Sequence, residues 1–213
     1  MQDSLIYIFD LFGTCIFAIT GAVKGVRQRL DFLGVIVYAI TVGCAGGMIR
    51  DCLIGSTPVS SFSDGNYLIV CIITGVIVFF IAPKVVGRWR IILFCDAIGL
   101  GVFTAIGAAK AMMLGIGPVG QILAGVIGAV GGGVLRDVFS REIPSVLVSD
   151  FYATASILGA VLFVALESFT PLPYGTRFLL SASLTIVLRI LAIQYGFKLP
   201  VARMAGEEKR SKN

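Results

Sequence analysis

Long apolar runs separated by short polar segments make up most of this chain. An α-helix needs about 20 apolar residues to cross the hydrocarbon layer of a bilayer. Seven runs approach that length, and the polar connections between them are too short to hold a soluble domain. The pattern therefore predicts an all-α integral membrane protein with seven transmembrane helices, at about residues 5–23, 32–49, 67–83, 91–109, 119–135, 146–166 and 178–195.

Composition supports a membrane location and argues against an enzyme. The 213 residues are 57% hydrophobic and 14% charged, and the mean hydropathy is +0.98, whereas soluble domains carry about 25% charged residues. A chain so short and so apolar has too little polar surface to face water, so we expect a multi-pass protein of the cell membrane. The sequence has no histidine, no metal-ligand cluster and no nucleophile–base pair. We therefore expect no enzyme activity and no cofactor.

Lysine and arginine are concentrated in alternate connections, and this predicts the orientation. Connections rich in these residues face the cytoplasm, which places the N-terminus outside and the C-terminus inside, with a basic cytoplasmic tail at 198–213. The net charge of +5 then reflects topology and attraction to anionic membrane lipids. No basic stripe alternates with aromatic residues, so we expect no nucleic-acid partner. The basic residues between the spans on the cytoplasmic side are Lys24, Arg27, Arg29, Lys84, Arg88, Arg90, Arg136 and Arg141.

The chain also contains an internal repeat with a spacing of 86 residues. We predict a first three-helix repeat at 1–86, a second at 87–172, and a seventh helix without a counterpart at 173–197. Because three spans reverse the direction of the chain, the second repeat would be inverted relative to the first, with a pathway at their interface. The aligned pairs include Asp10 with Asp96, Gly13 with Gly99, Phe17 with Phe103, Lys24 with Lys110, Arg50-Asp51 with Arg136-Asp137, and Pro58 with Pro144.

Two glycine motifs occupy equivalent positions near the ends of the second and fifth predicted spans. They are Gly46-Gly47 and Gly131-Gly132-Gly133. Small residues spaced four apart permit close helix packing, which accounts for most glycines in these spans. A double or triple glycine exceeds that need, so its repetition favours a break or kink that frees carbonyl oxygens for a cation. We therefore place potassium at the carbonyl groups of Gly46, Gly47, Gly131 and Gly132.

Four charged positions recur in the two repeats, and the inversion sorts them onto two faces of the membrane. Each face receives two acids and two bases, which can pair and so reduce the cost of lying near lipid. In the functional interpretation the Arg-Asp pairs and the lysines form a gate or mouth, and the other carboxylates attract cations. In the plainer interpretation each Arg-Asp pair is a salt bridge that ends a helix at the interface, and the lysines extend to the interface. The outer set is Asp10, Arg50, Asp51 and Lys110, and the inner set is Lys24, Asp96, Arg136 and Asp137. Arg189 in the seventh span has no repeat partner, and we expect it to extend to the cytoplasmic interface.

The chain resembles the prokaryotic members of the trimeric intracellular cation channel family, in the same superfamily as bacterial glycine-transporter-like membrane proteins. The resemblance rests on the motif from Gly131 to Asp137 and its copy from Gly46 to Asp51, and it extends over both repeats and the seventh helix. It implies a homotrimer with one pore in each subunit, in which the second and fifth helices bend at the glycine motifs. It also implies conduction of monovalent cations, chiefly potassium.

Two functions from different classes fit these features. The first is a channel for potassium or sodium, whose pore lies between the second and fifth spans and is lined by the glycine motifs, Asp10 and Asp96. The second is an alternating-access transporter of a small zwitterion such as glycine, whose carboxylate would meet a half-helix N-terminus. A scaffold without transport activity is disfavoured, because charges repeated within a membrane span are costly unless they have a function.

Overall fold

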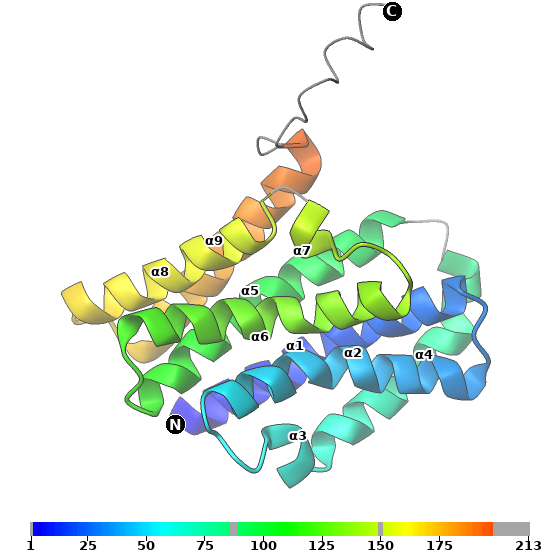
Figure 1. Cartoon of the computed structure of the whole chain (residues 1–213), viewed down its shortest axis with the longest axis horizontal. Helices are drawn as coiled ribbons and strands as arrows, with labels where there is room; N and C mark the ends of the chain where they lie inside the picture. Colours follow the sequence, from blue (N-terminus) through cyan, green and yellow to red (C-terminus); the bar gives the residue numbers. More distant parts are fainter. Residues whose placement is uncertain (1, 86–88, 149–150, 198–213) are drawn as a thin grey trace, which may run out of the picture.

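The chain folds as an all-helical bundle in the part that the structure describes (Figure 1). The computed structural model describes residues 2–85, 89–148 and 151–197, so the predicted basic tail at 198–213 and the predicted repeat boundary at 86–87 lie outside the described residues. Seven long helices and two single-turn helices occur in these ranges: α1 (Gln2–Arg27), α2 (Phe32–Leu53), α3 (Ser60–Ser63), α4 (Asn66–Val85), α5 (Trp89–Met113), α6 (Pro118–Phe139), α7 (Ser145–Val148), α8 (Ala153–Phe169) and α9 (Tyr174–Tyr195).

Five of the described helices, α1, α2, α5, α6 and α9, are long and apolar enough to cross a membrane, while α4 and α8 are apolar but shorter. The sixth predicted span began near residue 146, whereas α8 begins at Ala153, so that predicted boundary was wrong. The reason is that Ser145–Val148 forms the separate turn α7. The Ser145 backbone N–H and hydroxyl both donate hydrogen bonds to the Asp137 carboxylate, which holds this turn against α6.

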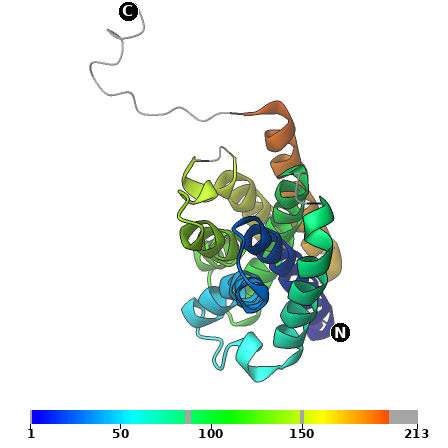
Figure 2. The same ribbon diagram turned by 90° about the vertical axis from the view of Figure 1, so that its right-hand side faces the viewer.

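Equivalent helices in the two halves of the chain have equivalent neighbours. α6 begins and ends 86 residues after α2. α1 packs on α2 and α4 as α5 packs on α6 and α8, while α1 meets α5 and α2 meets α6 in the middle of the bundle (Figures 1 and 2). α9 lies on α5 and α8. The second half therefore carries a helix that has no equivalent among the described helices of the first half.

α2 and α6 cross with their backbones in contact. A Cβ atom added to Gly46 would overlap the carbonyl oxygen of Gly128, and one added to Gly132 would lie 2.7 Å from the carbonyl oxygen of Val42. A Cβ atom on Gly131 would lie 3.1 Å from the Cα of Gly46. Glycine at these positions therefore allows the close approach that packing in a membrane requires, where small residues form the contacts between helices.

The backbone break predicted at the glycine motifs is absent from the described helices. α2 is helical through Gly46 and Gly47, and α6 is helical through Gly131, Gly132 and Gly133. In a continuous α-helix an interior carbonyl oxygen accepts the hydrogen bond of the N–H four residues later. The prediction of a break was therefore wrong. The kink that the same glycines favour, and potassium at the carbonyl groups of Gly46, Gly47, Gly131 and Gly132, stay predictions. Close packing accounts for the lack of a side chain at Gly46, Gly131 and Gly132.

The outer surface of the bundle includes wide apolar areas. On α4, for example, Ile69, Ile73, Ile77 and Phe80 are each at least half exposed. Contiguous apolar surface of this kind is rare on soluble monomers, because water penalises it, whereas lipid tails do not. The arrangement agrees with a bundle whose outer face contacts lipid.

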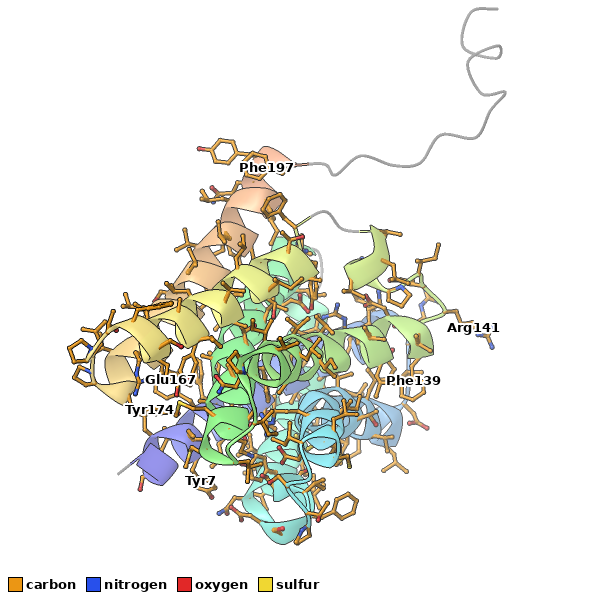
Figure 3. All side chains as sticks on the ribbon, turned by 60° about the vertical axis from the view of Figure 1, so that its left-hand side comes forward. Tyr7, Phe139, Arg141, Glu167, Tyr174 and Phe197 are labelled. Carbon is orange, nitrogen blue, oxygen red and sulfur yellow. The ribbon has the colours of Figure 1, made fainter. Side chains whose placement is uncertain are left out.

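The labelled side chains of Figure 3 mark two ends of the bundle. Tyr7, Glu167 and Tyr174 lie at one end, and Phe139 and Arg141 lie at the other. The start of α1, the end of α8 and the start of α9 thus share an end, and the end of α6 lies opposite. We refer to these as the Tyr7 end and the Arg141 end.

Candidate functional site

A cluster of paired charges lies toward the Tyr7 end, and we call it the Asp51 cluster (Asp10, Arg50, Asp51 and Lys110). Arg50 on α2 is completely buried. Its Nε donates to Asp51 Oδ1 at 2.8 Å, and its Nη2 donates to Asp10 Oδ2, on α1, at 3.2 Å. A buried guanidinium of this kind is tolerated only when carboxylates compensate its charge. The Arg50–Asp51 pair is therefore bonded to Asp10 of α1 inside the bundle, and it is more than a salt bridge that ends a helix at the interface.

Lys110 completes this cluster from the other half of the chain. Its Nζ lies 3.3 Å from both Asp51 Oδ1 and Asp10 Oδ2, and it donates to Ser60 Oγ at 2.7 Å. The Tyr67 hydroxyl also donates to Asp10, at 3.2 Å. The structure thus brings together the four residues of the predicted outer set, two acids with two bases, and it does so across the interface between the repeats.

A second cluster of the same design lies toward the Arg141 end, and we call it the Asp137 cluster (Asp96, Arg136 and Asp137). Arg136 Nη1 lies 2.6 Å from Asp96 Oδ1, and Arg136 Nε lies 3.0 Å from Asp137 Oδ1. Ser145 binds Asp137 Oδ2 through its N–H at 2.7 Å and its hydroxyl at 2.8 Å, as Ser60 binds Asp51 at 3.1 and 2.8 Å. In each cluster the aspartate therefore holds the arginine with one carboxylate oxygen and the serine of a short turn with the other.

The lysine of the inner set has a partner that the repeat did not predict. Lys24 Nζ donates to Glu142 Oε2 at 2.6 Å, in the connection that follows α6. Lys24, Arg27, Gln28 and Glu142 line a hollow of about 400 Å³ at the Arg141 end. Glu142 aligns with Ser56 in the first half, so a search for residues shared by the repeats passes over it. Its position shortly after the Arg136-Asp137 motif is the signal that could have found it.

A larger cavity of about 410 Å³ opens at the Tyr7 end beside the Asp51 cluster. Asp10 and Lys110 line it together with Asp64, Tyr7 and Tyr67. The Tyr7 hydroxyl donates to Asp64 Oδ2 at 2.6 Å. This bond, with the backbone N–H of the residue two positions later, lowers the pKa of the Asp64 carboxyl, because hydrogen bonds to the ionised form favour it. The mouth of the cavity therefore carries a carboxylate that stays charged.

Each end of the bundle therefore has a charge cluster and a hollow lined by charged side chains. Among the described residues, no group of three or more His, Cys, Asp or Glu could hold a metal ion. The clusters bring carboxylates and cationic side chains together. They can attract, orient or repel a small charged species that enters either hollow.

Comparison with known proteins assigns the family. A family model described as a glycine transporter matches residues 7–83 and 93–168. The UPF0126 membrane protein of Vibrio cholerae is 40% identical over 206 residues, which cover 94% of this chain and 84% of the relative. The UPF0126 inner membrane protein YadS of Escherichia coli is 35% identical over 198 residues, which cover 92% of this chain and 95% of the relative. The solved trimeric intracellular cation channel orthologue from Rhodobacter sphaeroides is 36% identical, with a TM-score of 0.87, over 91% of this chain and 100% of that one. This chain belongs to the trimeric intracellular cation channel family.

Membership of the trimeric intracellular cation channel family confirms three of the predictions. The resemblance read from the two Arg-Asp motifs is correct. The family consists of membrane channel proteins, so the chain is not an enzyme. A multi-pass location in the cell membrane agrees with the apolar helices and with relatives that are named membrane or inner membrane proteins.

Sequence reasoning missed the contribution of α9 to the Asp137 cluster. Arg189 was expected to extend to the cytoplasmic interface, and that prediction was wrong, because its side chain is buried. Its guanidinium lies 4.7 Å from the centroid of the Tyr152 ring. A Cβ atom on Gly133 would lie 2.8 Å from the Tyr152 hydroxyl and 3.6 Å from Asp96 Oδ1, so Tyr152 borders the cluster. The repeat pattern gave no signal for this contact, because Tyr152 aligns with Asn66 and α9 has no counterpart.

Proposed function

We propose that this protein is a channel for monovalent cations, chiefly potassium, with one pathway in each subunit. The observation that carries the proposal is the pair of charge clusters, built on equivalent residues of the two halves. The Asp51 cluster borders the cavity at the Tyr7 end, and the Lys24–Glu142 pair lines the hollow at the Arg141 end. The solved relative from Rhodobacter sphaeroides, a trimeric intracellular cation channel, supports it. The pathway runs from the Asp10 cavity, along the interface of the repeats, to the Lys24–Glu142 hollow.

The proposed channel places seven helices across the membrane, as two inverted three-helix repeats and a seventh helix. The Tyr7 end then faces outward and the Arg141 end faces the cytoplasm, with the N-terminus outside and the C-terminus inside. The alternation of basic connections supports this orientation. The equivalent neighbours of α2 and α6 support the division at 1–86 and 87–172. The trimeric solved relative supports a homotrimer, and the exposed apolar side chains of α4 support its contact with membrane lipids.

In this proposal the charged residues divide between attraction and restriction. Asp10 and Asp96 attract cations into the pathway, and Asp64 does the same at the outer mouth. The two Arg-Asp pairs, Arg50-Asp51 and Arg136-Asp137, narrow it, because a fixed positive charge repels a permeant cation. Lys110 and Lys24 act at the two mouths. The glycine motifs contribute through the close approach of α2 and α6.

Single-channel recording from purified protein in planar bilayers tests the proposal. In a potassium chloride gradient we expect discrete current steps whose reversal potential lies near the potassium equilibrium potential. Replacing potassium by sodium, and then by a large organic cation, measures selectivity. A reversal potential that follows chloride, or complete silence of protein that is shown to be folded and inserted, would contradict a cation channel.

A second candidate is a transporter of a small zwitterion such as glycine. The cavity at the Tyr7 end favours it, because Lys110 and the acids Asp10 and Asp64 line one space of about 410 Å³, and an amino acid carries both charges. The family model described as a glycine transporter also favours it. Uptake of radiolabelled glycine into proteoliposomes decides between the two. Saturable uptake without current steps supports the transporter, and current without saturable uptake supports the channel.

A further inference from the structure

Two phenylalanines related by the repeat stack at the centre of the bundle. Phe17 on α1 and Phe103 on α5 have ring centroids 5.2 Å apart, with an angle of 14° between the ring planes. Both side chains are buried, with 0% and 1% of their surface exposed. Phe103 follows Phe17 by 86 residues. The pair therefore lies where the two halves of the chain meet, and each half contributes the equivalent phenylalanine.

Each ring fits against a glycine of the opposite helix. A Cβ atom on Gly13 of α1 would lie 2.8 Å from Phe103 Cε2, and a Cβ atom on Gly99 of α5 would lie 2.8 Å from Phe17 Cε1. Gly99 is the repeat equivalent of Gly13. A larger residue at either position would push the opposite ring away, since real Cβ contacts are not this short. The two glycines thus allow the rings to overlap.

The stacked rings lie between the two charge clusters. On one side the Arg50 guanidinium, from the Asp51 cluster, lies 5.9 Å from the centroid of Phe103. On the other side a Cβ atom on Gly132 would lie 3.4 Å from Phe17 Cδ2, and the next residue, Gly133, borders Asp96 of the Asp137 cluster. Phe103 therefore lies next to the Asp51 cluster, and Phe17 lies next to the glycines of α6 that lead to the Asp137 cluster.

The backbone crossing of α2 and α6 closes the space beside the rings. A Cβ atom on Gly132 would lie 2.7 Å from the carbonyl oxygen of Val42 on α2 and 3.4 Å from the Phe17 ring. The helix crossing therefore lies directly beside the stack. An apolar constriction of this kind excludes water, and an ion without its water cannot enter it. Opening would require the two rings to separate, with loss of their mutual contact.

We propose that Phe17 and Phe103 together form the apolar barrier that holds this pathway closed. The inference rests on the proposed channel function, because it assigns the barrier of the same pathway. The two charge clusters collect cations on either side, and the ring pair determines whether the two sides communicate. The same residue from each half contributes to the barrier, so truncation of either ring has the same effect.

Truncation of each ring in planar bilayers with potassium chloride tests the barrier. We expect Phe17→Ala and Phe103→Ala each to raise the open probability about tenfold, which corresponds to about 1.4 kcal/mol of barrier. Phe17→Leu keeps an apolar side chain in the constriction, so it should raise the open probability much less. Size-exclusion chromatography verifies that each variant keeps the oligomeric state of the unmodified protein.

Phe178→Ala is the matched control. Phe178 is a fully buried ring of the same size in the same core, but it contacts Phe9 and Tyr174 and not the stack. It should lower thermal stability without raising the open probability. Equal open probabilities for Phe17→Ala, Phe103→Ala and Phe178→Ala, in a protein that conducts, would overturn the barrier alone. Silence of every variant would overturn both the barrier and the channel.

Discussion

The ammonium group of Lys110 on α5 lies 3.3 Å from the Asp51 carboxylate on α2 and so joins the two halves of the chain. The equivalent lysine, Lys24, instead lies 2.6 Å from Glu142. The acids differ in their surroundings, because the Asp51 side chain is fully buried whereas that of Glu142 is 54% exposed. The two ends of the bundle thus use the same basic residue in pairs of unequal strength.

Loss of the two lysines should therefore have unequal effects on stability. Lys110→Met leaves two buried carboxylates with one arginine, and removing one partner of a buried pair costs on the order of 3 kcal/mol. Lys24→Met breaks a pair with a partly exposed acid, which costs about 1 kcal/mol or less. Thermal unfolding in detergent, at low and at high potassium chloride, checks this. Equal decreases in Tm, or a salt effect confined to Lys110→Met, would contradict it.

The two glycines of the first motif should differ in their tolerance of alanine. A Cβ atom on Gly46 overlaps the carbonyl oxygen of Gly128, whereas one on Gly47 has its nearest neighbour, Arg50 Nη2, at 3.6 Å. Gly46→Ala should separate α2 from α6 and cost about 1–3 kcal/mol, as overpacking does. Gly47→Ala should be within about 0.5 kcal/mol of neutral, since alanine favours the helix. Unfolding temperatures of the two variants measure the difference, and the reverse order would refute the packing role.

Acid should affect the outer mouth through Asp64. Hydrogen bonding, chiefly from the Tyr7 hydroxyl, lowers the pKa of this carboxyl. A group with a lowered pKa keeps its charge, and any stability that this charge contributes, until the pH falls through the lowered value. Tyr7→Phe removes the largest cause, so the pKa of Asp64 should rise and its charge should be lost at a higher pH. Cation current against pH on the side of the Tyr7 end measures this. The acid midpoint should shift upward in Tyr7→Phe and disappear in Asp64→Asn, and an unshifted midpoint would be contrary to expectation.

The ring of Tyr152 should matter more than its hydroxyl group. The Arg189 guanidinium lies 4.7 Å from the ring centroid, and a desolvated cation–π contact contributes about 2 kcal/mol. Tyr152→Phe keeps this contact and should be mild. Tyr152→Leu removes it and should destabilise by about 2 kcal/mol or more, because a cavity is added. Equal unfolding temperatures for the two variants would show that the ring does not support Arg189.

Much of the fold could be predicted from the sequence, because each feature has a local cause. Runs of about 20 apolar residues fix helices in lipid, so the helices were predicted. The spacing of 86 residues brought Arg50 and Arg136 to equivalent places, and the membership of Asp10 and Lys110 in one cluster followed from the inversion. The predicted start of α8 was wrong because Ser145 binds the Asp137 carboxylate, and the hydropathy pattern does not show this contact.

The features that could not be predicted depend on contacts between helices. A double glycine weakens a helix locally and also permits another helix to pack closely against it, so the sequence does not distinguish the two roles. The position of Gly128 beside Gly46 shows close packing. Glu142 and Arg189 have no charged partner in the repeat alignment, so the repeat does not indicate which side chains they contact. The ring stack of Phe17 and Phe103 was visible as an aligned pair, but the alignment does not give the distance between them.

α9 packs on α5 and α8 and thereby covers one half of a bundle whose halves are otherwise alike. A rearrangement of the Asp137 cluster must carry Arg189 and its helix with it, whereas a rearrangement of the Asp51 cluster moves no such helix. In the proposed channel we therefore expect the two ends to need unequal energies to open. The currents at equal and opposite voltages should then differ.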